Sequence, residues 1–396
     1  MAASDALDLA ELARTYHEQG WVCVPQLFGA AALATMRGRI ERLVEGAATR
    51  LRAEGQLQTE HAGQPFGRRM MALIEEAGVE AAMAAFGEAG SVFGVERARG
   101  EAADEDERPI YDIVTHPGVL DVLEVLMGPE HPITYSYAGI MRARLPDGTN
   151  DSRNAKPFPF HQDSQYFDSP MAPAEEGAEP VVPAGQAIST ERLHIITVWC
   201  TSPHSTPPTP SQGPTQLSRC QPQCECWLRV AFRAPLVDTD AANGALTLVP
   251  GSHRWGQLDG QRDSDGNMKA YQPEELARVE SARRVMEACP AGGAIFFNNL
   301  VFHGSGPNQS DSVRWSLDWR YDAGAEGVAD AGEPGHAALR WWREQFDAPG
   351  RLDYGPFLVR DRSQQLDRPS WEAWVARRHE LLDAAGVEAA AVSPRL

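Results

Sequence analysis

Residues 312–321 read SVRWSLDWRY, and this run decides the class of fold. Successive side chains of a β-strand point to opposite faces, so residues two apart share a face. The aromatic and leucine side chains of the run share one face, and the other face carries Arg314, Ser316, Asp318 and Arg320. An apolar face packs on a core, whereas a polar face looks into an enclosed site or into water. From this segment alone, a strand that lines a site and a solvated edge strand both stay open.

Similar short runs precede this one. From Pro129 onward, β-branched and aromatic runs are separated by Gly, Pro, Asn and Asp, a pattern typical of strands. The runs are ITYSYAGIM (133–141), FPFHQD (158–163), LHIITVW (193–199), GALTLVP (244–250) and AIFFNN (294–299). Between them, only residues 273–286 are typical of a helix. The pattern disfavours a doubly wound parallel sheet and predicts a mainly β fold, a barrel or a sandwich.

Helices are expected at both ends of the chain. Apolar residues at helical spacing predict helices over 5–20, 30–55 and 117–128, with a strand at 21–28 between the first two. The tail from about residue 335 returns to helix, most clearly at 370–386. We therefore expect a helical N-terminal part at 1–128, a β core at 129–325 and a helical C-terminal extension at 326–396.

One segment does not match its surroundings. Residues 201–226 are rich in Pro, Ser, Thr and Gln and hold three of the six cysteines. Cys220, Cys224 and Cys226 lack the paired spacing of zinc modules. A disordered insert between two strands, a metal knuckle and translated non-coding sequence all remain open.

Composition excludes several classes of function. The chain has 396 residues, of which 42% are hydrophobic and 23% charged, as in ordinary globular proteins. Its formal charge of -19 disfavours nucleic acid as a partner. No stretch approaches the roughly 18 consecutive apolar residues of a membrane span, and the N-terminal residues do not resemble a secretory signal. A cytoplasmic protein without disulfides is expected. The oligomeric state is not specified.

Three side chains are candidate metal ligands. His161 and Asp163 in HQD lie two residues apart, so on a strand both point to one face while Gln162 points to the other. His303 follows the apolar run FFNNLVF and precedes a glycine turn. Two histidines and one carboxylate form the facial triad that suits non-haem Fe(II) and leaves positions open for other ligands. Taken singly, HQD also fits a surface strand, and His303 also fits a core or turn histidine.

Arg314 follows His303 on the polar face of the 312–321 strand. A guanidinium held rigidly near an iron can bind a carboxylate through two parallel hydrogen bonds. The distal carboxylate of a bound 2-oxoglutarate needs such a partner.

Taken together, these motifs resemble the phytanoyl-CoA dioxygenase family of Fe(II)- and 2-oxoglutarate-dependent oxygenases. The resemblance covers most of the chain: residues 16–43, HQD, NGALTLVPGSH (243–253) and residues 302–321, in the family's order. It implies a double-stranded β-helix, a cupin-like jelly-roll barrel flanked by N- and C-terminal helices.

The resemblance also implies roles for individual residues. His161, Asp163 and His303 are expected to bind iron, and Arg314 to pair with 2-oxoglutarate. Ser305 and Trp199 match family positions near the cosubstrate, and Ser316 is expected there too. The insert after Cys200 departs from the family pattern and puts the strand pairing near Trp199 in doubt.

The expected reaction is hydroxylation of a C–H bond of a small molecule by dioxygen, with succinate and CO2 as coproducts. Halogenating relatives replace the carboxylate ligand by a small residue, and Asp163 is present here. The alternative is a cupin-like metal-binding protein that is not an oxygenase: an isomerase, a hydrolase or a silent interaction protein. Nothing in the sequence specifies the substrate or settles whether it is a CoA ester. Its pocket is expected to involve Arg142, Arg144, Gln165 and Tyr166, although solvent-exposed arginines remain an alternative.

Overall fold

The structure is a computed structural model. It describes residues 8–88, 95–96, 101–149, 159–163, 229–255, 258, 260–262, 268–271, 273–323, 351–352 and 357–384.

A six-stranded antiparallel sheet forms the centre of the molecule, with strand order β1-β9-β4-β11-β3-β13. In this order the strands are Trp21–Val24, Ala294–Asn298, Arg229–Pro235, Arg314–Ala323, Ile133–Arg144 and Phe357–Arg360. Strand β11 lies between β4 and β3, and the register places Asp318 opposite Arg233 and Arg314 opposite Arg144. Because opposite residues of an antiparallel pair point to the same face, these polar side chains gather on one side of the sheet.

A smaller antiparallel sheet packs on this side, at the β1–β9–β4 half. It has the order β10-β5-β8, made of His303–Ser305, Leu246–Leu248 and Val285–Glu287. A buried apolar cluster joins the two sheets and contains Trp21, Ala231, Ile295 and Phe297 from the large sheet and Leu246 and Leu248 from the small one. The indole of Trp21 also donates a hydrogen bond of 2.9 Å to Glu287. Two short strand pairs complete the sheets: β6 (Gly260–Arg262) with β7 (Met268–Tyr271), and β2 (Val95–Glu96) with β12 (Arg351–Leu352).

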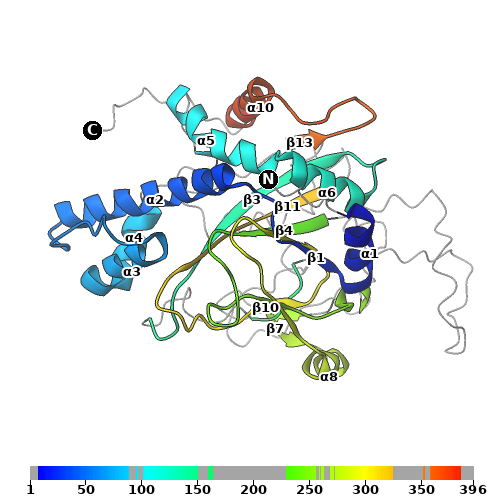
Figure 1. Ribbon diagram of the computed structural model, residues 1–396, viewed down its shortest axis with the longest axis horizontal. Helices are drawn as coiled ribbons and strands as arrows, with labels where there is room; N and C mark the ends of the chain where they lie inside the picture. The colour runs from blue at the N-terminus through cyan, green and yellow to red at the C-terminus, as the bar shows by residue number, and fades with distance from the viewer. Residues whose placement is uncertain are drawn as a thin grey trace, which may run out of the picture.

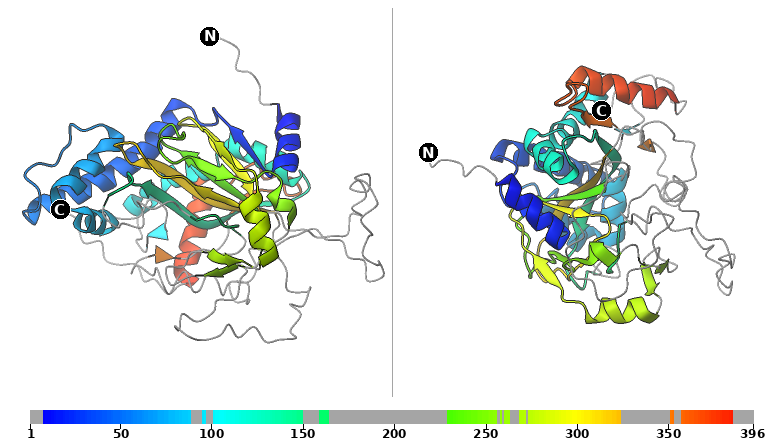
Figure 2. Two further views of the ribbon diagram at one scale, coloured as in Figure 1. Left: turned by 90° about the horizontal axis from the view of Figure 1, so that it is seen from below. Right: turned by 90° about the vertical axis from the view of Figure 1, so that its right-hand side faces the viewer.

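Helices cover the other side of the six-stranded sheet. They include α2 (Ala30–Ala53), α3 (Phe66–Ala77), α4 (Val79–Glu88), α5 (Glu101–Val114), α6 (Pro117–Met127) and α10 (Trp371–Ala384). Helix α1 (Leu9–Gln19) lies beside α6 at the edge, and a 3-10 turn (Ser252–Trp255) and α8 (Pro273–Ser281) lie on the side of the small sheet. Figure 2 shows α10 and α8 at opposite ends of the molecule, with the strands between them. Within the described ranges, no helix combines the length and the apolar character that crossing a membrane requires.

Local sequence signals determine where several helices begin and end. The side chain of Asp8 caps α1 by accepting a hydrogen bond of 3.0 Å from the amide of Glu11. Gly20 ends the helix at φ 93°, a left-handed conformation that glycine adopts without strain. Pro117 opens α6, where its missing amide hydrogen costs no helical hydrogen bond.

The apolar face of β11 packs against these helices. Trp315 lies between the rings of Phe66 in α3 and Phe86 in α4, with centroids 6.1 and 5.7 Å away. The Tyr321 hydroxyl donates to the carbonyl of Val114 at the end of α5. Each fully buried side chain of this kind contributes about 1.5–3 kcal/mol of transfer free energy. That packing forces Arg314, Ser316, Asp318 and Arg320 to the opposite face, as the alternation predicts.

The predicted combination of β-sheets with helical additions is confirmed, and the sheets are antiparallel. Two details of the prediction are corrected. Residues 285–287 form β8 and not the end of a helix, because Val285 pairs with Leu248. In the tail, residues 357–360 form β13, which pairs with β3. The large sheet therefore draws its outer strands, β1 and β13, from both helical ends of the chain. The division of the chain into three parts stays a prediction.

Candidate metal centre

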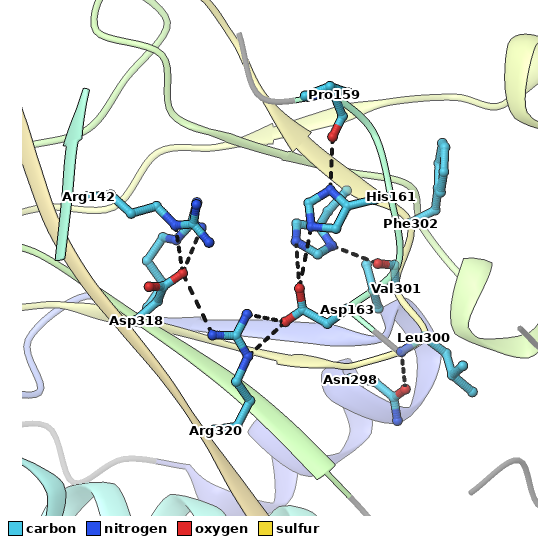
Figure 3. A network of polar contacts seen from close by, with 12 residues as sticks. Arg142, Pro159, His161, Asp163, Asn298, Leu300, Val301, Phe302, Asp318 and Arg320 are labelled. Carbon is cyan, nitrogen blue, oxygen red and sulfur yellow. Dashed lines mark hydrogen bonds and ion pairs between the residues drawn. The ribbon is translucent and has the colours of Figure 1, made fainter. Parts of the chain in front are cut away.

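Three buried side chains from two separate segments meet at one point (Figure 3). His161 and Asp163 come from residues 159–163, and His303 opens β10. The backbones of the two histidines form an antiparallel bridge, with N–O distances of 2.8 and 2.9 Å. The Nε2 atoms of His161 and His303 lie 3.4 and 3.7 Å from Oδ1 of Asp163. One ligand atom from each residue therefore lies within 4.8 Å of the others.

Backbone carbonyls set the tautomer of both imidazoles. Nδ1 of His161 is 2.8 Å from the carbonyl oxygen of Pro159, and Nδ1 of His303 is 2.8 Å from that of Val301. A carbonyl oxygen can only accept, so each Nδ1 carries a hydrogen, and in the neutral form of each ring Nε2 presents a lone pair. Burial, together with the neighbouring His161, lowers the pKa of His303 to about 3. His303 is therefore neutral at physiological pH.

Asp163 supplies the negative charge of the site. Its Oδ2 accepts hydrogen bonds of 2.6 Å from Nη2 and 3.1 Å from Nε of Arg320 in β11. Burial opposes ionisation, but the charge of Arg320 outweighs it and holds the pKa of Asp163 well below its usual range. Since Arg320 takes Oδ2, Oδ1 is the oxygen turned toward the histidines.

The donor set fits a divalent cation. Two nitrogen lone pairs and one carboxylate oxygen converge, and the protons of both rings are held on the far side by carbonyls. Buried lone pairs that face one another repel unless a positive charge lies between them. Two histidines and one carboxylate are the facial arrangement that suits non-haem Fe(II).

Gln162 points away from the metal centre, as the alternation predicts. Its Nε2 donates to the carbonyl of Leu300 at 2.7 Å, and its Oε1 accepts from the amide of Leu258 at 2.7 Å. The first bond ties residues 159–163 to the segment that leads into β10, and the second ties them to Leu258.

Arg314 is buried without a carboxylate partner among the residues that the structure describes. It is 3% exposed, its Nη1 is 3.4 Å from the Ser316 hydroxyl, and its Nε has no partner within the same residues. Burial, followed by the nearby charges of Arg233, Arg144 and Arg142, lowers its pKa to about 9. A buried guanidinium in this state is stabilised by any anion that reaches it.

Asp318 is shared by several arginines. Its Oδ2 lies 2.8 Å from Nε of Arg142, 3.3 Å from Nη2 of Arg233 and 4.0 Å from Nη1 of Arg320. Burial works against ionisation, but these three charges lower the pKa of Asp318. Figure 3 shows the resulting chain from Arg142 through Asp318 and Arg320 to Asp163.

The other residues predicted for the site fall into two groups. Arg142, Arg144, Ser305 and Ser316 lie in β3, β10 and β11 on the side of the metal centre, and Arg144 donates to the Gly306 carbonyl at 3.3 Å. Trp199, Gln165, Tyr166 and the segment 201–226 lie outside the described residues.

Sequence reasoning missed Arg233. The sequence does contain a signal for it: Arg233 is a charged residue within the mostly apolar run RVAFRAP (229–235). In a strand, alternate side chains of this run would share a face. Its place beside Asp318 follows from the pairing of β4 with β11, which no local pattern reports.

Comparison with known proteins agrees with the resemblance expected from the sequence. The model of a family described as Phytanoyl-CoA dioxygenase (PhyH) matches residues 179–316. This range contains His303 and Arg314 and begins after Asp163. A curated relative from Caenorhabditis elegans, "Probable phytanoyl-CoA dioxygenase", is 23% identical over 219 residues, or 54% of this chain and 51% of that protein. The chain thus spans about half the length of this relative. Both matches support the family prediction.

Several solved structures are similar to this chain. One is the epimerase SnoN in complex with Fe3+, alpha ketoglutarate and nogalamycin RO, with 18% identity and a TM-score of 0.40 over 79% of this chain and 82% of that one. Another is EctD from S. alaskensis with 2-oxoglutarate and 5-hydroxyectoine, with 15% identity and a TM-score of 0.40 over 82% and 79%. The apo non-heme monooxygenase ThoJ has 17% identity and a TM-score of 0.40 over 95% and 98%.

Proposed function

We propose that this chain is an Fe(II)- and 2-oxoglutarate-dependent dioxygenase that hydroxylates an unactivated C–H bond of a small-molecule substrate. The observation that carries the proposal is the convergence of His161, Asp163 and His303 with every proton directed away from their meeting point. The match of residues 179–316 to the phytanoyl-CoA dioxygenase family supports it. Fe(II), held by these three residues, and 2-oxoglutarate would together supply oxidation by dioxygen, with succinate and CO2 as coproducts.

Arg314 is the proposed partner of the distal carboxylate of 2-oxoglutarate. The support is its burial without a carboxylate among the described residues and its position on a rigid strand of the large sheet. Ser316 lies beside it, and Ser305 follows His303 by two residues on β10. We propose these two hydroxyls, with Trp199, as further contacts of the cosubstrate.

The protein's own groups prepare the site. Arg320 holds the Asp163 carboxylate in one orientation, and the carbonyls of Pro159 and Val301 hold the two rings. The three ligands are 2–3% exposed, so the surrounding chain excludes most water from them. Rigid and dry ligands of this kind need little reorganisation when the reaction begins.

We also propose that the two antiparallel sheets belong to a double-stranded β-helix, with the residues 129–325 as its core and helical parts before and after it. The support is the packing of the two sheets on one apolar cluster beside the metal centre.

The test is Fe(II)-dependent conversion of 2-oxoglutarate to succinate. Protein purified anaerobically and supplied with Fe(II) should decarboxylate 2-oxoglutarate faster when a substrate from a screen of small molecules is present. Asp163→Ala should abolish this coupled turnover, because the cation loses the one carboxylate among its three proposed ligands. Asp112→Ala, which removes an exposed carboxylate paired with Arg108, is the matched control and should be unaffected.

The alternative, a cupin-like metal-binding protein that is not an oxygenase, predicts metal binding without succinate. It also has no use for the buried guanidinium of Arg314. Full succinate formation by Asp163→Ala would instead remove Asp163 from the ligand set.

A further inference from the structure

The polar side of the large sheet carries more positive than negative charge. Arg142, Arg233, Arg314 and Arg320 interact electrostatically with one another or with the two carboxylates of Asp163 and Asp318. Among the described residues, this group of four guanidiniums and two carboxylates has a surplus of two positive charges. Arg144, in contrast, has Asp147 nearby.

The four arginines of this group differ in the partners that they contact. Arg320 is engaged by Asp163, and Arg314 is the proposed anchor of 2-oxoglutarate. Arg233 shares one oxygen of Asp318 with Arg142, at 3.3 and 2.8 Å. Oδ1 of Asp318, the other oxygen, has no hydrogen bond within the described part of the chain.

Of Arg142 and Arg233, Arg233 is the more deeply buried. Its side chain is 8% exposed, and its Nε has no partner among the residues described. Burial and the neighbouring Arg142 depress its pKa to about 10 even though Asp318 opposes them. Its charge also influences both Asp163 and His303, so it lies close to the proposed iron ligands. A buried donor without an acceptor costs free energy unless a ligand satisfies it.

We infer that the substrate of this site carries an oxyanion group, such as a carboxylate, sulfate or phosphate, and that Arg233 binds it with Arg142 beside it. The inference rests on the proposed function and names the substrate class of that same site. Arg233 is connected to Asp163 through Asp318 and Arg320, so the anionic group would bind in the same site as the proposed iron.

Ligand binding without turnover tests the inference. Wild-type protein is loaded with Mn(II) in place of Fe(II) and with N-oxalylglycine, a non-reactive analogue that fills the 2-oxoglutarate site. Hexanoate, hexyl phosphate, hexyl sulfate and the neutral control hexanol are then titrated by calorimetry. At least one anion should bind more tightly than hexanol, and comparison of the three identifies which oxyanion the site prefers.

Substitution assigns the effect to Arg233. Arg233→Met should weaken binding of the preferred anion by about 10-fold to 100-fold, the loss expected for a charge-assisted hydrogen bond in a buried site, and should leave hexanol unchanged. The variant should fold, because Asp318 keeps Arg142 and Arg320 as partners. Should it not fold, Arg142→Met is measured instead, since that side chain is 24% exposed and its anion binding should fall in the same direction. Arg50→Met, an equal change of charge on the surface of α2, is the control and should have no effect.

The outcomes separate the two proposals. If Mn(II) and N-oxalylglycine fail to bind the wild-type protein, the proposed function fails. If they bind but no anion exceeds hexanol, or Arg233→Met leaves anion binding unchanged, the inference is overturned and the proposed function stands. If Arg233→Met weakens N-oxalylglycine as much as Arg314→Leu does, Arg233 belongs to the cosubstrate site and the inference is likewise overturned.

Discussion

Replacing Asp318 by Asn tests the charge arrangement of the site most directly. Asp318 is 2% exposed, and its carboxylate contacts both Arg142 and Arg233. Asparagine keeps the shape of the side chain and one acceptor oxygen but removes the negative charge. The change therefore leaves buried positive charges without their counterion.

The structure allows the loss of stability to be estimated. The contact with Arg142 at 2.8 Å is a full charge-assisted hydrogen bond, whereas those with Arg233 and Arg320 at 3.3 and 4.0 Å are weaker. Removing one partner from a buried ion pair costs about 3–5 kcal/mol. We expect Asp318→Asn to lower the free energy of unfolding by an amount in this range.

The dependence on pH has a definite sign. Because its neighbours lower the pKa of Asp318 in the folded protein below its ordinary value of 3.8, the ionised carboxylate stabilises the fold above that value. The contribution is lost as the pH falls through the lowered folded pKa. The difference between wild type and Asp318→Asn should therefore be largest near neutral pH and shrink in acid.

The assay is urea unfolding of the metal-free protein, with Asp112→Asn as the control. Asp112 pairs with Arg108 at 3.3 Å but is 47% exposed, so its loss should cost no more than about 1 kcal/mol. The double variant Asp318→Asn with Arg233→Met should lose less than the sum of the two single changes, by about 1–3 kcal/mol. A loss below about 1 kcal/mol for Asp318→Asn, or strict additivity with Arg233→Met, would refute the reasoning.

Three further predictions concern other parts of the molecule. Arg314→Leu should raise the concentration of N-oxalylglycine needed for half-saturation by about 10-fold to 100-fold, measured by calorimetry; an unchanged value would point to another anchor. Glu124→Gln should lower the free energy of unfolding by about 0.5–1 kcal/mol at pH 7 and by less at pH 3, since a hydrogen bond from Arg362 and the charge of Arg360 lower the pKa of Glu124. An equal loss at both pH values in urea unfolding would contradict this. Gly244→Ala should cost about 1–3 kcal/mol, because Gly244 has φ +78° and an added Cβ would lie 2.6 Å from the Gly306 carbonyl oxygen. Gly29→Ala, with nothing within 4 Å of the added atom, is the control, and equal urea midpoints for the two variants would show the reasoning to be wrong.

Periodic patterns in the sequence were sufficient to predict the helices and strands that bury one face. The alternation in 312–321 predicts β11 and its two faces, and helical spacing with glycine stops predicts α1 and α6. The spacing of HQD likewise predicts that His161 and Asp163 point one way and Gln162 the other. These features depend on neighbours within a few residues, so a local pattern contains the information.

The remaining features depend on pairing between distant segments. Residues 357–360 form a strand because they pair with the edge of β3. Residues 285–287 form a strand because they pair with the edge of β5. Arg233 joins the site only through the register of β4 against β11, which sets it opposite Asp318. Composition and spacing in the sequence therefore determined the candidate ligands and the class of fold. Tertiary structure alone decided which arginines share a carboxylate and which remain short of an anion, because burial and charge balance arise only when separate strands meet.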